Sequence, residues 1–128
     1  MHSHVKIGLA ALLGFGMGAA AMQGLRAQPH PPAYVISEIE VTDADAYLRD
    51  YVPLANRALA ESGQRRLVSG GRTVALAGAP PASRIVVSVF DSLEKAQAAY
   101  TSPAYLEARR IGDRYGRLRI FAVEGLPQ

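Results

Sequence analysis

Glu38 and Arg119 are the two side chains of this 128-residue chain whose pairing offers the clearest chemistry. Both lie in segments with strand-like alternation, and we expect them to meet on one face of a sheet. A carboxylate beside a guanidinium in a half-buried cleft can orient a polar ligand. On an enolisable substrate the carboxylate would act as the base, and the guanidinium would stabilise the anion. An ion pair within an interface explains the same two residues.

Four further side chains are candidates for ligand contacts. Tyr34 and Tyr105 could offer a phenol, or pack with a solvated hydroxyl. Arg109 lies one helical turn from Tyr105 and could bind a carboxylate of a ligand. A solvent-exposed helix surface explains the same arginine equally well. Ser88 offers a hydroxyl, or simply a small side chain where space is limited. The candidate ligand-binding residues are therefore Tyr34, Glu38, Ser88, Tyr105, Arg109 and Arg119, and no catalytic residue is assigned.

The residue inventory excludes several kinds of site. The chain has no Cys, which removes disulfides, thiolate nucleophiles and zinc-thiolate sites. Its three imidazoles, His2, His4 and His30, all precede the first predicted strand. Serine-histidine chemistry and histidine-ligated metal therefore have no residue inside the domain to use. We expect neither a metal nor a cofactor.

The charge pattern does not favour nucleic acid. The chain has 14 basic and 11 acidic residues, for a net charge of +3. Lys6 and Arg26 flank an N-terminal apolar segment, so the remainder carries only about +1. The two adjacent arginine pairs, Arg65-Arg66 and Arg109-Arg110, are far apart in sequence. A nucleic-acid interface needs basic residues clustered on one face, so we expect no such partner.

The N-terminal segment has the layout of a secretory signal. Lys6 precedes an uncharged run over residues 7–25, and small residues follow at Ala21 and Ala27, after either of which cleavage could occur. We expect residues 1–27 to be a signal peptide and the protein to be secreted or periplasmic. The alternative is retention as a membrane anchor, because about 20 apolar residues span a bilayer. The proline-rich residues 28–32 then form a linker.

Alternation, glycines and capping residues define the elements of the mature domain. A helix is expected between Thr42 and Gly63, with a kink or break near Val52 because Pro53 lacks an amide hydrogen. Gly70-Gly71 supplies the turn of a hairpin. Ser102 and Pro103 begin the second half of a split second helix. The predicted strands are residues 33–41, 65–69, 72–77, 84–90 and 117–123, and the predicted helical pieces end near Gly63, Tyr100 and Tyr115.

This order predicts an α+β domain over residues 33–125. It is a ferredoxin-like βαββαβ sandwich with an extra β-hairpin. In the strands predicted over residues 84–90 and 117–123, one side is apolar throughout and could be covered by helices. It consists of Ile85, Val87, Val89, Leu118, Ile120 and Ala122. The opposite side is half apolar and carries Val86, Ser88, Phe90, Arg119, Phe121 and Val123. Such a face needs a cover, so the pattern predicts a homodimer packed sheet to sheet.

The chain resembles the family catalogued as domain of unknown function 1330, within the dimeric α+β barrel superfamily. The segments that carry the resemblance cover nearly all of residues 33–125. They are Ala33-Tyr34-Val35, Leu67-Val68-Ser69-Gly70-Gly71, Phe90-Asp91-Ser92-Leu93-Glu94-Lys95-Ala96, Tyr100-Thr101-Ser102-Pro103-Ala104-Tyr105 and Val123-Glu124-Gly125. The resemblance implies a dimer with a cleft between sheet and helices, in which relatives bind or oxidise small organic molecules.

Three functions are consistent with these observations. The first is a dimeric protein of the cell envelope that binds a small organic ligand between the mixed sheet face and the helix carrying Tyr105 and Arg109. The second is a cofactor-independent monooxygenase or isomerase with Glu38 as base and Arg119 as anion stabiliser. The third is a structural dimerisation module. An enclosed pocket lined by Tyr34, Glu38 and Arg119 would favour the first two, and a dry, filled face would favour the third.

Overall fold

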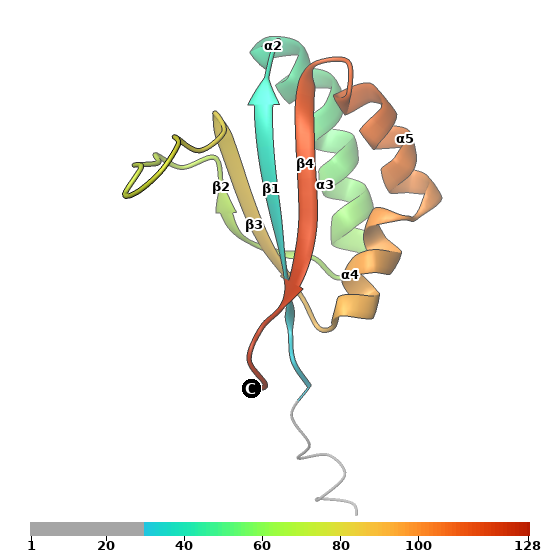
Figure 1. The fold of residues 1–128 in the computed structure, drawn as a ribbon. Helices are drawn as coiled ribbons and strands as arrows, with labels where there is room; N and C mark the ends of the chain where they lie inside the picture. Colours follow the sequence, from blue (N-terminus) through green and yellow to red (C-terminus); the bar gives the residue numbers. More distant parts are fainter. Residues whose placement is uncertain (1–29) are drawn as a thin grey trace, which may run out of the picture.

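The computed structural model describes residues 30–128, in which one antiparallel sheet carries all of its helices on one side (Figure 1). The predicted signal peptide, residues 1–27, lies outside the described residues. The strand order is β2-β3-β1-β4, which confirms the ferredoxin-like α+β fold. The elements are β1 (Ala33–Val41), α2 (Ala44–Ala46), η1 (Tyr47–Tyr51), α3 (Val52–Glu61), β2 (Arg65–Ser69), β3 (Arg84–Phe90), α4 (Leu93–Tyr100), α5 (Pro103–Gly112) and β4 (Gly116–Glu124).

The central strand β1 matches its predicted bounds and anchors the core. Its alternate residues Ala33, Val35, Ser37 and Ile39 are buried beneath the helices, as the period of two along a strand requires. Tyrosines and alanines of η1, α3, α4 and α5 pack onto this side. The alanines bring the helices close to the sheet, so the larger tyrosines fill the space between the two layers.

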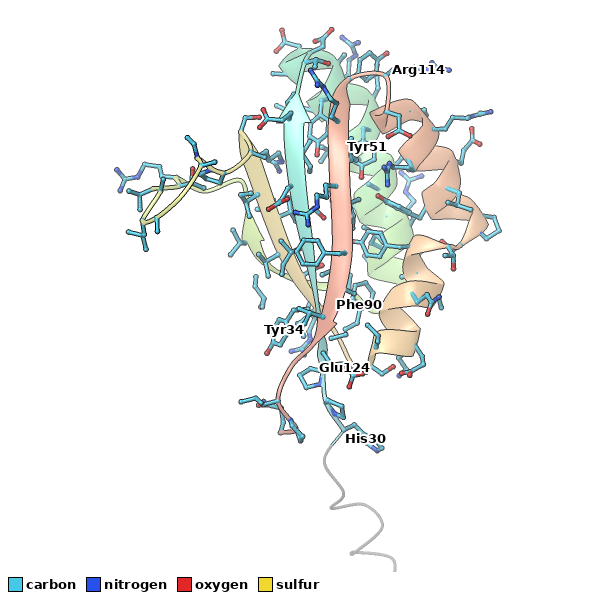
Figure 2. The ribbon with its side chains drawn as sticks, viewed as in Figure 1. His30, Tyr34, Tyr51, Phe90, Arg114 and Glu124 are labelled. Carbon is cyan, nitrogen blue, oxygen red and sulfur yellow. The ribbon has the colours of Figure 1, made fainter. Side chains whose placement is uncertain are left out.

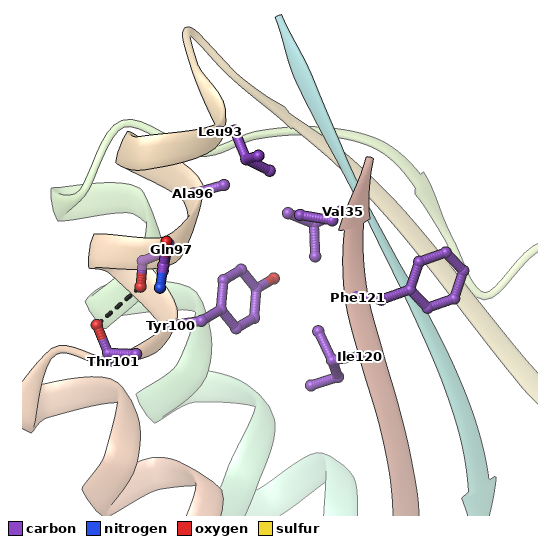
Figure 3. A pocket seen from close by; sticks show the side chains of 9 residues that line it. Val35, Leu93, Ala96, Gln97, Tyr100, Thr101, Ile120 and Phe121 are labelled. Carbon is purple, nitrogen blue, oxygen red and sulfur yellow. Dashed lines mark hydrogen bonds between the residues drawn. The ribbon is translucent and has the colours of Figure 1, made fainter. Parts of the chain in front are cut away.

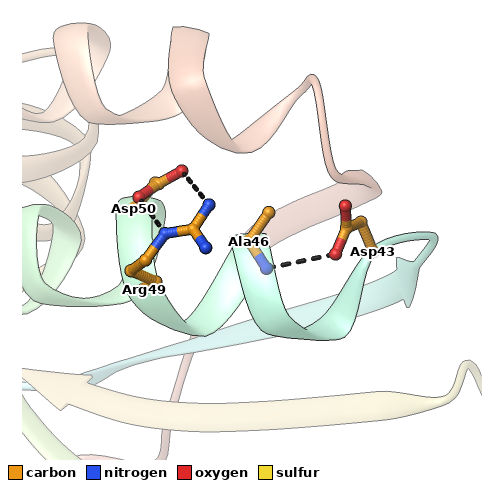
Figure 4. A network of polar contacts seen from close by, with 4 residues as sticks. All are labelled: Asp43, Ala46, Arg49 and Asp50. Atoms are coloured by element: carbon orange, nitrogen blue, oxygen red, sulfur yellow. Dashed lines mark hydrogen bonds and ion pairs between the residues drawn. The ribbon is translucent and has the colours of Figure 1, made fainter.

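The first helical segment is continuous but contains a π-helical turn. The Asp43 carboxylate accepts a hydrogen bond from the Ala46 amide at 3.1 Å and caps the start, next to the exposed Arg49–Asp50 ion pair (Figure 4). Within η1 the amide of Val52 donates to the carbonyl of Tyr47. Pro53 then opens α3, where its missing amide costs little. The helical segment thus passes from π to α geometry at Val52 and continues through Pro53, where a kink or a break was predicted.

The predicted hairpin across Gly70-Gly71 is wrong. Strand β2 pairs with β3 instead, and the Gly70 amide donates to the carbonyl of Ile85 at 2.9 Å. Residues 72–77 form no strand and are exposed. They belong to a long loop that projects beyond the sheet on the side away from α5 (Figure 1). The glycine at 70 adopts φ +72°, and no strand follows it to pair with β2.

The prediction of which side of β3 faces the helices is also wrong. Val35 of β1 pairs with Ser88, and Tyr34 pairs with Val89. Directly opposed residues in an antiparallel pair share a face. Val86, Ser88 and Phe90 therefore lie beneath the helices, while Ile85, Val87 and Val89 face away from them. For β4 the prediction holds, because Leu118, Ile120 and Ala122 pair with the buried side of β1.

The side of the sheet without helices is called the open face here. It consists of three cross-strand rows, in which β1 supplies the central residue. Two rows are apolar or aromatic and one carries charges. The rows are Val89, Tyr34 and Val123; Val87, Ile36 and Phe121; and Ile85, Glu38 and Arg119. Figure 2 shows Tyr34 on this side and Phe90 toward the helices.

The second helical segment and the last strand follow the predicted pattern. Ser92 caps α4 by accepting from the Lys95 amide, and Ser102 caps α5 by accepting from the Tyr105 amide. Helix α5 ends at Gly112, somewhat earlier than predicted. Among residues 30–128 the structure contains no helix long and apolar enough to cross a bilayer.

Candidate functional site

The structure separates the six predicted ligand-binding residues into two groups. Tyr34, Glu38 and Arg119 lie on the open face. Ser88, Tyr105 and Arg109 lie on the helix side, since Ser88 pairs with the buried Val35 and α5 covers that side. The predicted cleft between the mixed sheet face and α5 is therefore wrong, because the two faces that it combined lie on opposite sides of the sheet.

On the open face the predicted contact between Glu38 and Arg119 is present. An Arg119 guanidinium nitrogen donates to the Glu38 carboxylate at 2.6 Å. The guanidinium carbon also lies 5.0 Å from the centre of the Phe121 ring, within the range of a cation–π contact. The Arg119 side chain is 72% exposed and that of Glu38 is 34% exposed. Glu40 and Arg117 oppose each other in the next position of the same face, so the Glu38–Arg119 pair lies at the charged end of this surface.

Tyr34 lies at the end of the open face, remote from the Glu38–Arg119 row. Its ring approaches Gly125, where an added Cβ would overlap it. The segments before β1 and after β4 are joined at this point, because the Gly125 amide donates to the carbonyl of Pro32 at 2.7 Å. Tyr34 is half-buried by these contacts, so its ring mainly packs β1 against the segment after β4.

On the helix side four tyrosines converge between the two layers. The hydroxyls of Tyr51 and Tyr105 lie 3.1 Å apart, within hydrogen-bonding distance. The rings of Tyr47 and Tyr51 are 5.1 Å apart between centres, and those of Tyr100 and Tyr105 are 4.7 Å apart. Gly112 of α5 makes room for the Tyr51 ring, which a Cβ at this position would strike. These four residues are called the tyrosine cluster below.

Burial keeps these phenols protonated. It raises the pKa of Tyr100 to about 12, an effect that the nearby hydroxyl of Ser88 opposes. Burial also raises the pKa of Tyr51 and of Tyr105, since a phenolate is poorly solvated between the layers. For Tyr47 burial again raises the pKa, while the adjacent Arg84 guanidinium opposes it. At neutral pH the tyrosine cluster is therefore a set of neutral hydrogen-bond donors.

The cluster borders a small cavity of about 40 Å³ between sheet and helices. Ser37, Gln64 and Arg84 contribute polar atoms to its wall together with the four phenols. Such a volume accepts ordered water, which needs only about 10–15 Å³. Two buried polar atoms on this side have no hydrogen-bond partner, namely Ser88 Oγ and Arg84 Nε. Buried polar groups are nearly always paired, so this region has unused capacity for a polar ligand or water.

Arg109 is engaged within the fold. Its Nε donates to the Asp113 carboxylate at 2.8 Å, and a terminal nitrogen donates to the carbonyl of Leu118 at 3.2 Å. These contacts tie α5 to β4. The guanidinium also lies close enough to Tyr105 to oppose the burial-induced rise of the pKa of that phenol. Arg109 therefore acts as a structural neighbour of the cluster.

A separate apolar groove of about 270 Å³ lies between α4 and β4 (Figure 3). Val35, Leu93 and Ile120 line it together with the ring of Tyr100, while Phe121 points away from it. The Thr101 hydroxyl at its rim is occupied, since it donates to the carbonyl of Gln97 at 2.8 Å. Through Tyr100 the groove adjoins the tyrosine cluster. Over residues 30–128 no three His, Asp or Glu side chains gather as metal ligands would.

Sequence reasoning missed Tyr47, Tyr51, Tyr100 and Arg84 as members of a site. The spacing of Tyr47 and Tyr51 by four residues was a usable signal, because such residues share one face of a helix. Arg84 was hidden by the wrong assignment of the faces of β3. Its position opposite Ile39 places it beneath the helices.

Comparison with known proteins agrees with this fold. The family described as Domain of unknown function (DUF1330) matches residues 32–126. No curated protein matches the chain. A solved protein of unknown function from Rhodopseudomonas palustris is 15% identical, with a TM-score of 0.52, and the match covers 86% of this chain and 94% of that one.

Two further solved structures are similar in fold. SnoaB, a cofactor-independent oxygenase from Streptomyces nogalater, is 10% identical with a TM-score of 0.53, over 77% of this chain and 96% of its own. A candidate antibiotic biosynthesis monooxygenase from Nitrosomonas europaea is 14% identical with a TM-score of 0.53, over 77% of this chain and 93% of its own. At these identities the likeness establishes the ferredoxin-like α+β fold and nothing finer.

Proposed function

The chain belongs to the family described as Domain of unknown function (DUF1330), and from its site geometry we propose that it is a homodimer that binds a small organic molecule on the helix side of its sheet. The observation that carries the proposal is the pair of buried, unpartnered polar atoms, Ser88 Oγ and Arg84 Nε, beside the tyrosine cluster. Protonated phenols and a free guanidinium nitrogen are donors, so the ligand should present oxygen acceptors.

The open face supports the dimer. Ile36, Val87 and Phe121 form a continuous apolar row across three strands, and Phe121 is 39% exposed. A contiguous apolar surface of this kind is typical of an interface. A two-fold axis would let one copy of the face cover the other and would enclose the Glu38–Arg119 pair. Enclosure would convert an exposed ion pair into one that fixes the register between subunits.

Export of the mature domain is part of the proposal. Residues 1–27 would direct the chain across a membrane, and cleavage would leave a protein that begins at Met22 or Gln28. Intact-mass measurement of the protein purified from its own host distinguishes these two ends. A mass that includes residues 7–25 would support the anchored alternative instead.

Native mass spectrometry of that same preparation tests binding and assembly together. We expect a dimer that carries a co-purifying organic molecule of low mass. Tyr105→Phe removes one phenol from the cluster and should lower occupancy, whereas Tyr115→Phe removes a phenol outside it and should not. A monomer without any adduct contradicts the proposal. A dimer that never carries a ligand would favour a structural dimerisation module.

A second candidate is a cofactor-independent monooxygenase or isomerase. The observation that favours it is the 2.6 Å contact between Arg119 and the Glu38 carboxylate on the open face, because a guanidinium beside a base can stabilise the anion that the base generates. Glu38 would remain the candidate base and Arg119 the anion stabiliser only if the dimer encloses them. Glu38→Gln should then abolish turnover of an enolisable substrate. Unchanged turnover would exclude this role for Glu38.

A further inference from the structure

Arg84 is a guanidinium held beneath the helices without an acidic partner. It opens β3 on the buried side, opposite Ile39. One terminal nitrogen donates to the Ser69 hydroxyl at 3.2 Å, while Nε is buried and has no acceptor. None of the ion pairs within residues 30–128 includes Arg84. A buried N–H group of a charged side chain is costly when unpaired, so the fold keeps this donor at the expense of stability.

The guanidinium opens onto a second space, the outer hollow, of about 350 Å³. Its walls are mostly apolar and come from Val41, Ala44, Leu48 and the ring of Tyr47. Arg84 and Tyr47 border both the outer hollow and the 40 Å³ cavity of the tyrosine cluster. The Arg84 guanidinium carbon lies 5.9 Å from the centre of the Tyr47 ring. Volumes of about 300 Å³ and above suit small organic ligands.

Gly70 keeps the space of the guanidinium free. A Cβ at this position would overlap a terminal nitrogen of Arg84. The backbone at Gly70 has φ +72°, which also favours glycine. The guanidinium is thus fixed between the Ser69 hydroxyl, the Tyr47 ring and the glycine backbone, and its Nε is enclosed by protein atoms.

We propose that Arg84 anchors the carboxylate of a small organic acid whose apolar body lies in the outer hollow. This inference rests on the proposed function and names the chemical class of its ligand. A carboxylate matches the planar fork of a guanidinium through two parallel hydrogen bonds. Arg84 is the one cationic side chain that lines the hollow in the described structure. A single positive charge favours a monoanion over a phosphate, which usually has several cationic or backbone donors around it.

Two further polar side chains line the hollow, Tyr47 and Ser83, and the hydroxyl of Ser83 is already engaged. The Ser83 hydroxyl donates to the carbonyl of Ile39 at 3.1 Å and accepts from the amide of Val41 at 3.2 Å. Arg84 therefore supplies the positive charge of the hollow, and the phenol of Tyr47 can add a second donor to a ligand. The rest of the wall offers apolar contact.

Calorimetric titration of the full-length protein tests this assignment. The probes are benzoate and cyclohexanecarboxylate, with benzamide as the neutral counterpart of the first. We expect both carboxylates to bind and benzamide to bind at least about tenfold more weakly, because charge-assisted hydrogen bonds are the stronger ones. Arg84→Gln should weaken carboxylate binding by a similar factor, and Arg84→Lys should recover only part of it. Arg72→Gln, an exposed arginine of the following loop, is the charge-matched control.

A glycine pair tests the geometry without removing the charge. Gly70→Ala should displace the Arg84 guanidinium and weaken carboxylate binding. Gly78→Ala carries a comparable backbone cost, since φ is +78° at Gly78, yet an added Cβ there meets nothing within 4 Å. Thermal melting of both variants separates loss of binding from loss of folding. We expect Gly70→Ala to lose affinity and Gly78→Ala to retain it.

Three outcomes overturn the assignment. Equal binding of benzoate and benzamide, or unchanged benzoate affinity in Arg84→Gln, shows that the carboxylate is not held by Arg84. If Arg84→Gln weakens dimerisation and leaves ligand affinity unchanged, the acceptor is a carboxylate of a second copy. In each of these cases the proposed function survives if a neutral ligand co-purifies with the protein, and it fails only if no small molecule binds at all.

Discussion

The two faces of the sheet bury their polar groups in different ways. On the helix side the hydroxyls of Tyr51 and Tyr105 meet at 3.1 Å, and both rings are almost wholly buried. On the open face the charged atoms of Glu38 and Arg119 meet at 2.6 Å but remain largely in contact with solvent. The hydrogen bond between the two tyrosines is already shielded from water within one chain. The attraction between Glu38 and Arg119 becomes strong only when another surface excludes water from the pair. Under the proposed function the two faces therefore have different tasks, ligand binding on the helix side and assembly on the open face.

The largest difference is expected between two phenylalanines on opposite faces. Phe90 is 1% exposed beneath the helices and Phe121 is 39% exposed on the open face. Phe90→Ala should lower the free energy of unfolding by about 3–5 kcal/mol, because it leaves a cavity in the core. Phe121→Ala should cost less, and its cost should depend on protein concentration. Urea unfolding at two protein concentrations measures both effects. A loss of stability in Phe121→Ala that does not depend on protein concentration would argue against a dimer.

A charge at the centre of the open face should break the assembly. Val87→Asp places a carboxylate between its cross-strand neighbours Val68 and Ile36 and should raise the dimer dissociation constant at least about thirtyfold. Leu76→Asp is the control, because Leu76 lies on the projecting loop and is 92% exposed. Sedimentation velocity distinguishes the two variants. Equal behaviour of both would remove the open face from the interface.

Alkaline pH should lower the free energy of unfolding through the buried tyrosines of the helix side. The pKa of Tyr100 is raised to about 12 by burial, from an ordinary value of 10.0. Between these pH values the unfolded chain loses a proton that the folded chain keeps, so stability falls as the pH rises through the window. The slope for one such group approaches about 1.4 kcal/mol per pH unit. Tyrosinate absorbance and urea unfolding from pH 9 to 12 measure it, and Tyr100→Phe should flatten the curve.

The smallest effect is expected for the ion pair of the open face. In dilute protein Glu38→Gln should change the free energy of unfolding by less than about 1 kcal/mol, as is usual for exposed pairs. Glu107→Gln, which breaks the exposed pair with Arg110, provides the matched comparison. At high concentration Glu38→Gln alone should cost more, because dimerisation would enclose its partner. An identical cost at both concentrations would place the pair outside the interface.

Local sequence signals predicted the elements well. Strand β1 and strand β3 have their predicted bounds, and Ser102 caps α5 as its position before Pro103 indicated. These features depend on residues adjacent in the chain. The contact between Glu38 and Arg119 was also predictable, because the ferredoxin-like order makes β1 and β4 neighbours.

Features that depend on the register between strands or on contacts across the core were not predictable. Both sides of β3 are rich in apolar residues, so a period of two could not say which side meets the helices. The register between β1 and β3 decides which side of β3 is buried, because it pairs Ser88 with the buried Val35. The alternation of residues 72–77 resembled a strand, but β2 pairs with β3 and leaves that segment without a partner. The tyrosine cluster joins residues that are about 50 positions apart, which local patterns do not reveal.

The π-helical turn η1 has a consequence for how the chain tolerates insertions and deletions. A π turn accommodates one residue more than an α turn, and such turns recur at functional sites. Removing one residue from Tyr47–Tyr51 would restore regular α-helical spacing and rotate everything on one side of the deletion by about 100°. The buried face of α3 would then turn away from the face that carries Tyr47. The length of this segment, and not only its composition, is therefore under structural constraint.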